Sequence, residues 1–315
     1  MNSIITEIVR HLGTDEKEAT LIVTKAIAGG ETTEGNLSDW FESRFLPNLV
    51  FIEEDGYARM CIDALKIIGK TAATDYGSSR QRDFGQSWAD MTRGYLGELA
   101  FQLFLEKRGI VVSLGHEVGE LDDYLAGDIQ QIKKHGEELR APKIQIGIKA
   151  TKWNGIWLDI PGDQFSHSEA HALIKVGTGR DHLFAFFKKI SVFKDKVLKV
   201  GQDIGLLTAE QSTEIYDSIP TFKRIPAYIA GFVRRDSGYP LGKYDGKKGR
   251  KHYTITTWEG PWGSADMERV KREQEITGAA TFSGIGKFSH DSAYIFNTGS
   301  LLWEQQKWDN LISEL

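Results

Sequence analysis

The sequence contains a single cysteine, Cys61, among its 315 residues. One cysteine excludes an internal disulfide and a zinc site built on several thiolates, and both exclusions fit a reducing compartment. The longest apolar run, Leu183 to Phe187, is far shorter than the roughly 20 residues of a membrane-spanning helix. The first residues lack the basic start and apolar stretch of a secretory signal. We therefore expect a cytoplasmic protein with no membrane partner.

The chain has no overall excess of positive charge, since its net charge is -5. Charge is nevertheless uneven along the sequence, because residues 223 to 251 carry nine Lys or Arg residues against only Asp236 and Asp245. A basic segment on an acidic body binds polyanions locally. The residues of this segment that we expect to bind a polyanion are Arg234, Arg235, Lys243, Lys247, Lys248, Arg250 and Lys251.

Hydrophobic periodicity predicts three segments along the chain. Residues 1–85 form a helical N-terminal region, in which Thr14 or Asp15 caps a helix that ends before Gly29 and Gly30. Residues 86–200 form a core, and residues 201–315 form a third region with weaker patterning, to which we assign partner recognition and dimerisation. The third region is predicted to contain a helix at 208–218, strands at 228–233 and 253–257, and a final helix at 301–312.

The predicted core begins with a helix at 93–109 and continues with β-rich segments. The expected strands lie at 110–112, 128–132, 144–151, 156–160, 172–176 and 182–190. A helix that leads into such a set of strands indicates an α/β (α+β) domain with a central sheet flanked by helices.

Three residues of this core stand out chemically. Glu98 lies on a helix that is apolar nearly all round, where a carboxylate is costly unless it is paired or bound to a metal. Asp128 opens a strand after Gly127, and taken alone it is better explained as an ordinary turn residue. Lys149 shares a strand face with Gln145 and Gly147, while the intervening isoleucines point to the core. A carboxylate on a helix, an aspartate at a strand start and a lysine on the next strand suit phosphodiester hydrolysis.

These residues resemble the PD-(D/E)xK nuclease superfamily, and most of all its type II restriction endonucleases. The matching motifs are Gly97-Glu98-Leu99-Ala100, Asp128-Ile129 and Ile148-Lys149-Ala150-Thr151, and the resemblance covers roughly residues 90 to 190. It implies a restriction-endonuclease-like core with a mixed central sheet. One departure is clear, because Gly147 stands where the family usually has Asp or Glu. Glu98 is then the expected replacement, and Gln145 is the alternative.

The resemblance also implies a cofactor, a reaction and partners. Asp128 and Glu98 would bind Mg²⁺, and Lys149 would assist the attacking water. The expected activity is sequence-specific cleavage of double-stranded DNA by a homodimer, with the basic segment contacting the DNA. Two alternatives stay open. One is a repair or junction-resolving nuclease of the same superfamily, and the other is a non-catalytic DNA-binding protein with a decayed nuclease core, which Gly147 keeps possible.

A second set of residues has a metal-ligand pattern. His167 and His171 are four residues apart, with His182 or Asp159 as a third ligand. The glutamate between the two histidines is at the wrong phase for a zinc protease, so we favour a polar helical turn that joins two strands.

Overall fold

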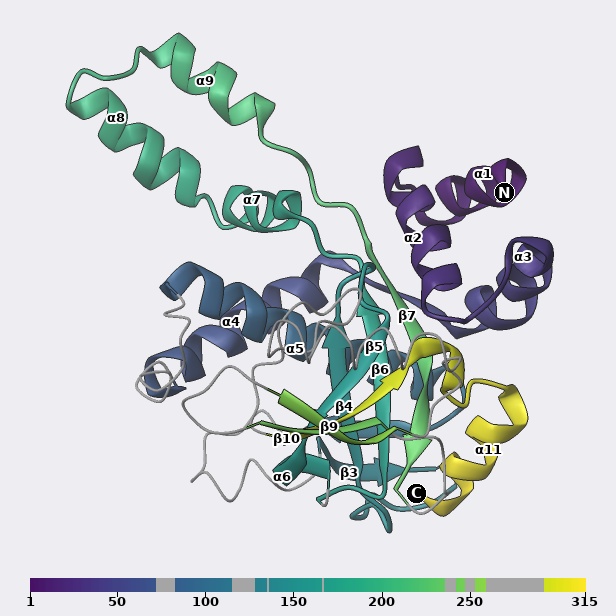
Figure 1. Cartoon of the computed structure of the whole chain (residues 1–315). Helices are drawn as coiled ribbons and strands as arrows, with labels where there is room; N and C mark the ends of the chain where they lie inside the picture. The colour runs from purple at the N-terminus through teal and green to yellow at the C-terminus, as the bar shows by residue number, and fades with distance from the viewer. Residues whose placement is uncertain are drawn as a thin grey trace.

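A computed structural model of the chain describes residues 1–71, 83–114, 128–134, 136–165, 167–235, 242–246, 253–258 and 292–315. It shows a mixed α/β protein in which a central sheet is flanked by helices (Figure 1), as the sequence predicts. In the part of the chain described, no helix is long and apolar enough to cross a membrane.

The central sheet has four strands in the order β1-β7-β6-β4. Their bounds are β1 Leu49–Ile52, β7 Ile225–Arg234, β6 Ala170–Val176 and β4 Ile146–Thr151. The sheet is mixed, because β4 and β6 run parallel while the β6–β7 and β7–β1 pairs are antiparallel. Every residue of β6 is buried, which is the pattern of a strand covered on both faces. β1 corrects our prediction in part, because it is a strand within the N-terminal region, residues 1–85, that we expected to be helical.

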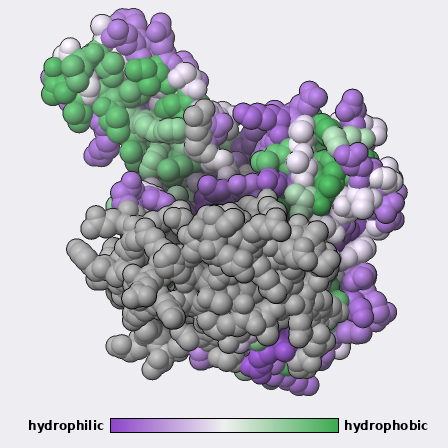
Figure 2. All heavy atoms as spheres, viewed as in Figure 1, coloured by the Kyte–Doolittle hydropathy of each residue, from purple (hydrophilic) through white to green (hydrophobic). Residues whose placement is uncertain are grey.

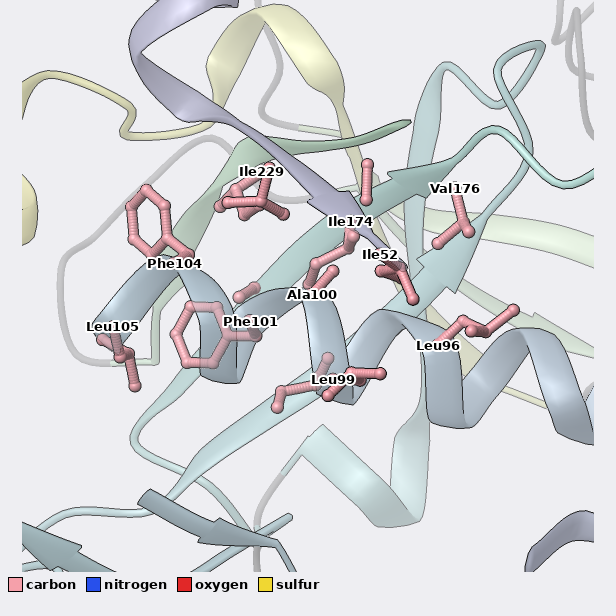
Figure 3. Close-up of a cluster of buried hydrophobic side chains, with 14 of the residues drawn as sticks. Ile52, Leu96, Leu99, Ala100, Phe101, Phe104, Leu105, Ile174, Val176 and Ile229 are labelled. Atoms are coloured by element: carbon pink, nitrogen blue, oxygen red, sulfur yellow. The ribbon is translucent and has the colours of Figure 1, made fainter. Parts of the chain in front are cut away.

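Helix α5 (Phe84–Glu106) packs against one face of this sheet, and Figure 3 shows its apolar side chains in one cluster with Ile52, Ile174, Val176 and Ile229 of the strands. Its first turn is fixed by Asp83, whose carboxylate accepts a hydrogen bond of 2.7 Å from the Gln86 N–H. Helices α4 (Glu54–Thr71) and α11 (Gln305–Glu314) complete the same core, and Trp308 of α11 packs on Phe104.

A second core forms on the opposite face, between the sheet and the N-terminal helices. These helices are α1 Asn2–Leu12, α2 Glu16–Ala28, η1 Glu34–Asn36, α3 Leu37–Asp39, η2 Trp40–Phe45 and η3 Leu46–Asn48. The cap of α2 is confirmed, because Asp15 accepts from the Glu18 N–H at 2.7 Å and the helix ends at Ala28. Buried Arg44 joins this layer to the sheet through the carbonyls of Ala230 (3.0 Å) and Thr298 (2.6 Å).

Two smaller sheets adjoin the central one. The first has the order β5-β10-β8-β9, and the second is the antiparallel pair β2-β3. Their bounds are β5 Trp157–Pro161, β10 Ser292–Asn297, β8 Gly242–Gly246, β9 Tyr253–Trp258, β2 Val111–Leu114 and β3 Ile129–Lys133. The short helices α6 Gly162–Phe165 and η7 Thr298–Ser300 follow β5 and β10.

The strand predicted at 182–190 is wrong, because these residues belong to helix α7 (Arg180–Lys189). Leu183, Phe186 and Phe187 recur at helical spacing and pack on the α5 side of the core. The chain continues through η6 (Phe193–Leu198), α8 (Lys199–Asp203) and α9 (Ala209–Ser218), which extend away from the sheets in Figure 1. We call residues 180–218 the helical arm.

Strands from all three predicted segments meet in the central sheet, since β1 of the first segment pairs with β7 of the third, and β7 pairs with β6 of the second. The segment boundaries at 85 and 200 stay predictions. The expected helix at 208–218 is confirmed as α9, whose Thr208 cap accepts from the Gln211 N–H at 3.2 Å.

Candidate active site

Strand β4 brings the predicted Asp and Lys together. The Asp128 carboxylate accepts a hydrogen bond from the backbone N–H of Ile148, the residue that precedes Lys149. Asp128 directly precedes β3, so it reaches β4 from the start of another strand. A carboxylate bonded to backbone amide has little freedom to rotate away. The structure therefore fixes Asp128 one residue from Lys149.

Glu98 comes to the same strand from helix α5. A Cβ atom at Gly97 would lie 2.6 Å from the Ala150 Cβ, so the helix backbone rests directly on β4 at a position that only glycine permits. Glu98 follows Gly97, and Lys149 precedes Ala150. The Glu98 side chain is half-buried, which is less enclosed than the apolar helix led us to expect. Arg93, on the same helix, makes an ion pair of 3.0 Å with Asp90.

The Lys149 ammonium is held by a side chain that the sequence did not single out. Its Nζ donates a hydrogen bond of 2.5 Å to Gln164 Oε1 on α6. Gln164 is acceptor and donor but carries no charge, so it orients the ammonium without neutralising it. The Lys149 side chain is thus directed from β4 toward α6.

Asp159 on β5 is a further acidic group near Lys149. Burial raises the pKa of Asp159 to about 6, and the nearby Lys149 ammonium opposes that rise. Its buried Oδ1 atom has no hydrogen-bond partner among the described residues. Sequence reasoning named Asp159 only as a possible third ligand for two histidines. The available signal was a single charge inside the apolar strand Ile156 to Ile160.

Gly147, where the family carries an acid, is packed against His171. A Cβ atom at Gly147 would lie 2.7 Å from His171 Nδ1 and 3.3 Å from Ser168 Oγ. Because β4 and β6 pair in parallel with Gly147 opposite His171, the imidazole covers the space that an acidic side chain would need. The glycine is therefore a packing requirement of this site.

The two histidines do not share a helical turn, so that prediction is wrong. His171 is buried within strand β6, where burial lowers its pKa to about 4 and keeps the ring neutral at pH 7. Its ring stacks on Phe165 with centroids 5.6 Å apart. His182, offered as a third ligand, instead accepts a hydrogen bond of 3.0 Å from the Gly179 N–H at the start of α7.

The basic residues expected to contact DNA have different positions. Arg234, at the end of β7, binds the Glu314 carboxylate through two contacts of 2.5 and 2.9 Å. Arg235 lies 3.6 Å from Glu169. The backbone of Lys243 belongs to β8. The remaining four lie outside the described residues: Lys247, Lys248, Arg250 and Lys251.

The donor chemistry at β4 fits a hard divalent cation. Asp128, Glu98 and Asp159 offer carboxylate oxygens, and the unpartnered Asp159 Oδ1 is the kind of atom that a cation satisfies. Mg²⁺ binds oxygen ligands, often one or two carboxylates together with water and substrate phosphate. Within the described ranges, no three His, Cys, Asp or Glu side chains lie close enough together to hold a metal ion, so these carboxylates do not form a gathered cluster.

The chain was compared with protein-family models, curated proteins and solved structures. No family model, no curated protein and no solved structure matches it.

Proposed function

We propose that this protein is a Mg²⁺-dependent endonuclease that hydrolyses phosphodiester bonds in double-stranded DNA, with its active site on strand β4. The observation that carries the proposal is the hydrogen bond from the Ile148 N–H to Asp128, which holds a carboxylate beside Lys149. The motif pattern Glu98, Asp128 and Lys149 adds support, because all three residues lie at or next to residues that contact one short stretch of β4.

The chain's own groups suit this reaction. Hydrolysis forms a bond from a water oxygen to phosphorus and breaks the bond from phosphorus to the leaving oxygen. Negative charge grows on the phosphoryl oxygens meanwhile, and a fixed cation nearby stabilises it. The Lys149 ammonium, oriented by Gln164, supplies that cation and a donor that positions the water.

Asp128 and Glu98 are the residues that would hold Mg²⁺. When bound, the ion polarises the phosphate and lowers the pKa of its water. Asp159 is a third candidate ligand, since Gly147 provides no carboxylate and Asp159 lies near Lys149. We extend the proposal to a restriction-type enzyme that is cytoplasmic, cuts a defined sequence and acts as a homodimer, on the strength of the motif resemblance.

Plasmid cleavage by the purified chain tests the proposal. The wild type is incubated with supercoiled plasmid in Mg²⁺ or in EDTA, beside Lys149→Ala. The matched control is Lys307→Ala, because Lys307 is an exposed lysine on α11. We expect Mg²⁺-dependent discrete fragments from the wild type and the control, and at least a ~100-fold slower reaction from Lys149→Ala, the usual loss for a group that stabilises transition-state charge.

Other outcomes separate the alternatives. DNA binding without cleavage in Mg²⁺ or Mn²⁺ contradicts the nuclease and favours a binding protein with a decayed core. Preference for nicked or branched DNA over intact plasmid favours a repair or junction-resolving enzyme. A smear of products contradicts sequence specificity.

A further inference from the structure

The helical arm exposes an unusual amount of apolar surface. Half of the fourteen large hydrophobic side chains exposed in the described structure lie within its 39 residues. They are Phe184, Ile190, Val197, Val200, Ile204, Leu206 and Ile215. Ile204 and Leu206, near the tip, are 64% and 73% exposed. Figure 2 shows the arm as the broadest green area in that view. Contiguous apolar surface of this kind marks an interaction site.

The outer arm also lacks a core of its own. Between residues 190 and 219 only Leu198 and Ser212 are buried, and no residue of that range belongs to either core cluster. Helix α7, where the arm begins, is fixed to the core, because its Phe186 packs edge-on against Tyr57 of α4 and Trp88 of α5. Isolated helices shorter than about 12 residues are marginal in water. The ten residues of α9 and the five of α8 therefore need a surface that covers them.

The charges of the arm identify the occupant. The outgoing limb, residues 180–203, carries six Lys or Arg against three Asp, and one of the six, Lys189, is already paired with Glu54 and Asp55 of α4. The returning limb, residues 204–219, carries Glu210, Glu214 and Asp217 and no Lys or Arg. Both limbs bear apolar residues among these charges, so the arm presents a positive and a negative half on one apolar surface. A two-fold axis would match the positive limb of one copy with the negative limb of another.

We propose that the helical arm is a dimerisation surface, covered by the same arm of a second copy of this chain. Each arm then buries Val200, Ile204 and Leu206 against its counterpart. The basic residues Lys194, Lys196 and Lys199 face the partner subunit's α9. The evidence for this dimerisation surface comes from the helical arm alone, so it does not depend on the nuclease proposal. It joins two copies of β4, which is what cleavage of both strands by one site per chain requires.

The oligomeric state of the full-length chain tests this surface. Light scattering after size exclusion should give the wild type twice the mass of one chain. Val200→Glu/Ile204→Glu should give the mass of one chain, with an unchanged circular dichroism spectrum, because both side chains are exposed. The matched control is Val111→Glu/Leu139→Glu, whose side chains are similarly exposed outside the arm, at 52% and 50%. The control should remain dimeric.

Charge reversal keeps the test decisive even if the apolar variant misfolds. Glu210→Lys/Glu214→Lys makes both limbs positive, and Lys194→Glu/Lys196→Glu/Lys199→Glu makes both negative. Each variant alone should dimerise at least tenfold more weakly than the wild type, and an equal mixture should recover the dimer. A monomeric wild type, a dimer indifferent to every arm variant, or no recovery on mixing overturns the proposal. A dimer that binds DNA without cutting it supports this surface while contradicting the nuclease.

Discussion

His171 on β6 lies where a side chain at residue 147 of β4 would extend, with its Nδ1 atom 2.7 Å from the position of a Cβ there. This contact explains why the strand that carries Lys149 has glycine two residues earlier. Under the nuclease proposal, the acid that the motif usually places there comes from another element, and Glu98 on α5 and Asp159 on β5 are the candidates.

We predict that Gly147→Ala destabilises the protein by about 1–3 kcal/mol, because the added methyl overpacks a buried site. Urea unfolding measures the loss. Gly94→Ala is the control, since a Cβ at that position of α5 meets nothing within 4 Å and alanine favours helix. In the Gly147→Ala/His171→Ala double variant, part of the loss should return. Additive losses would mean that His171 is not the obstacle.

We predict that Asp159→Asn stabilises the fold at neutral pH. Burial raises the pKa of Asp159 to about 6 from an ordinary value of 3.8. The unfolded chain therefore ionises first, and the carboxyl lowers stability as pH rises from about 4 to 6. The free energy of unfolding of the variant should exceed that of the wild type by on the order of 1–3 kcal/mol above pH 6, and the two should be equal below pH 4. Thermal unfolding from pH 4 to 8 checks this.

The control for the Asp159 series is Asp195→Asn. Asp195 is exposed on η6, so this substitution should change the free energy of unfolding by no more than about 0.5 kcal/mol. Under the nuclease proposal, Asp159→Asn should also cut DNA more slowly than the wild type. Stability gained together with cleavage lost is the signature of a charge kept for function. Equal stability of wild type and variant at every pH would contradict the burial argument.

We predict that Glu31→Gln destabilises the chain by about 3–5 kcal/mol at pH 7, because it leaves buried cations uncompensated. Burial alone would raise the pKa of Glu31, but Lys175 and Arg44 lower it to about 2. The Lys175 Nζ lies 2.6 Å from the Glu31 carboxylate. The ionised Glu31 carboxylate contributes its full stabilisation to the fold above about pH 4.5, and this stabilisation is lost as pH falls through about 2.

Denaturant unfolding measures this loss against Glu7→Gln. Glu7 binds Arg10 at 2.5 Å on the surface of α1, and exposed pairs contribute less than about 1 kcal/mol. Similar losses in the two variants would show that burial does not set the strength of the Glu31 interaction.

Under the nuclease proposal, Asp128→Ala should slow Mg²⁺-dependent cleavage at least ~100-fold, while DNA affinity in EDTA stays within about threefold of the wild type. The variant should also lose any Mg²⁺-induced rise in melting temperature, which reports ion binding without turnover. Full cleavage by Asp128→Ala would remove this residue from the site.

The sequence predicted helices well where their signals are local. α2 and α9 begin at Asp15 and Thr208, whose side chains cap the next turn. Residues 182–190 were misread, because a short apolar run fits a strand or a helix and periodicity alone does not decide. The start of α7 was decided by the Gly179 N–H bond to His182, a contact that spacing does not reveal.

The site was predicted only in part, for the same physical reason. The sequence places Asp128 just before β3 and Lys149 on β4, and the hydrogen bond from the Ile148 N–H to Asp128 brings the two close together, while their catalytic roles stay predictions. Asp159 and Gln164 approach Lys149 because β5 and α6 fold back beside β4, a tertiary arrangement that no local pattern encodes. β1 was missed because four apolar residues, Leu49 to Ile52, are too few to show a strand period.

Membership of β1 in the central sheet has a consequence for synthesis of the chain. Arg44, just before β1, bonds Tyr228 and Thr298, which lie 184 and 254 residues later. At the usual 5–20 residues per second, the ribosome needs on the order of ten to fifty seconds to make that interval. The first helices therefore emerge long before their partners exist. Contacts this distant slow folding, so the layer of N-terminal helices is completed only after the last strands of the chain are made.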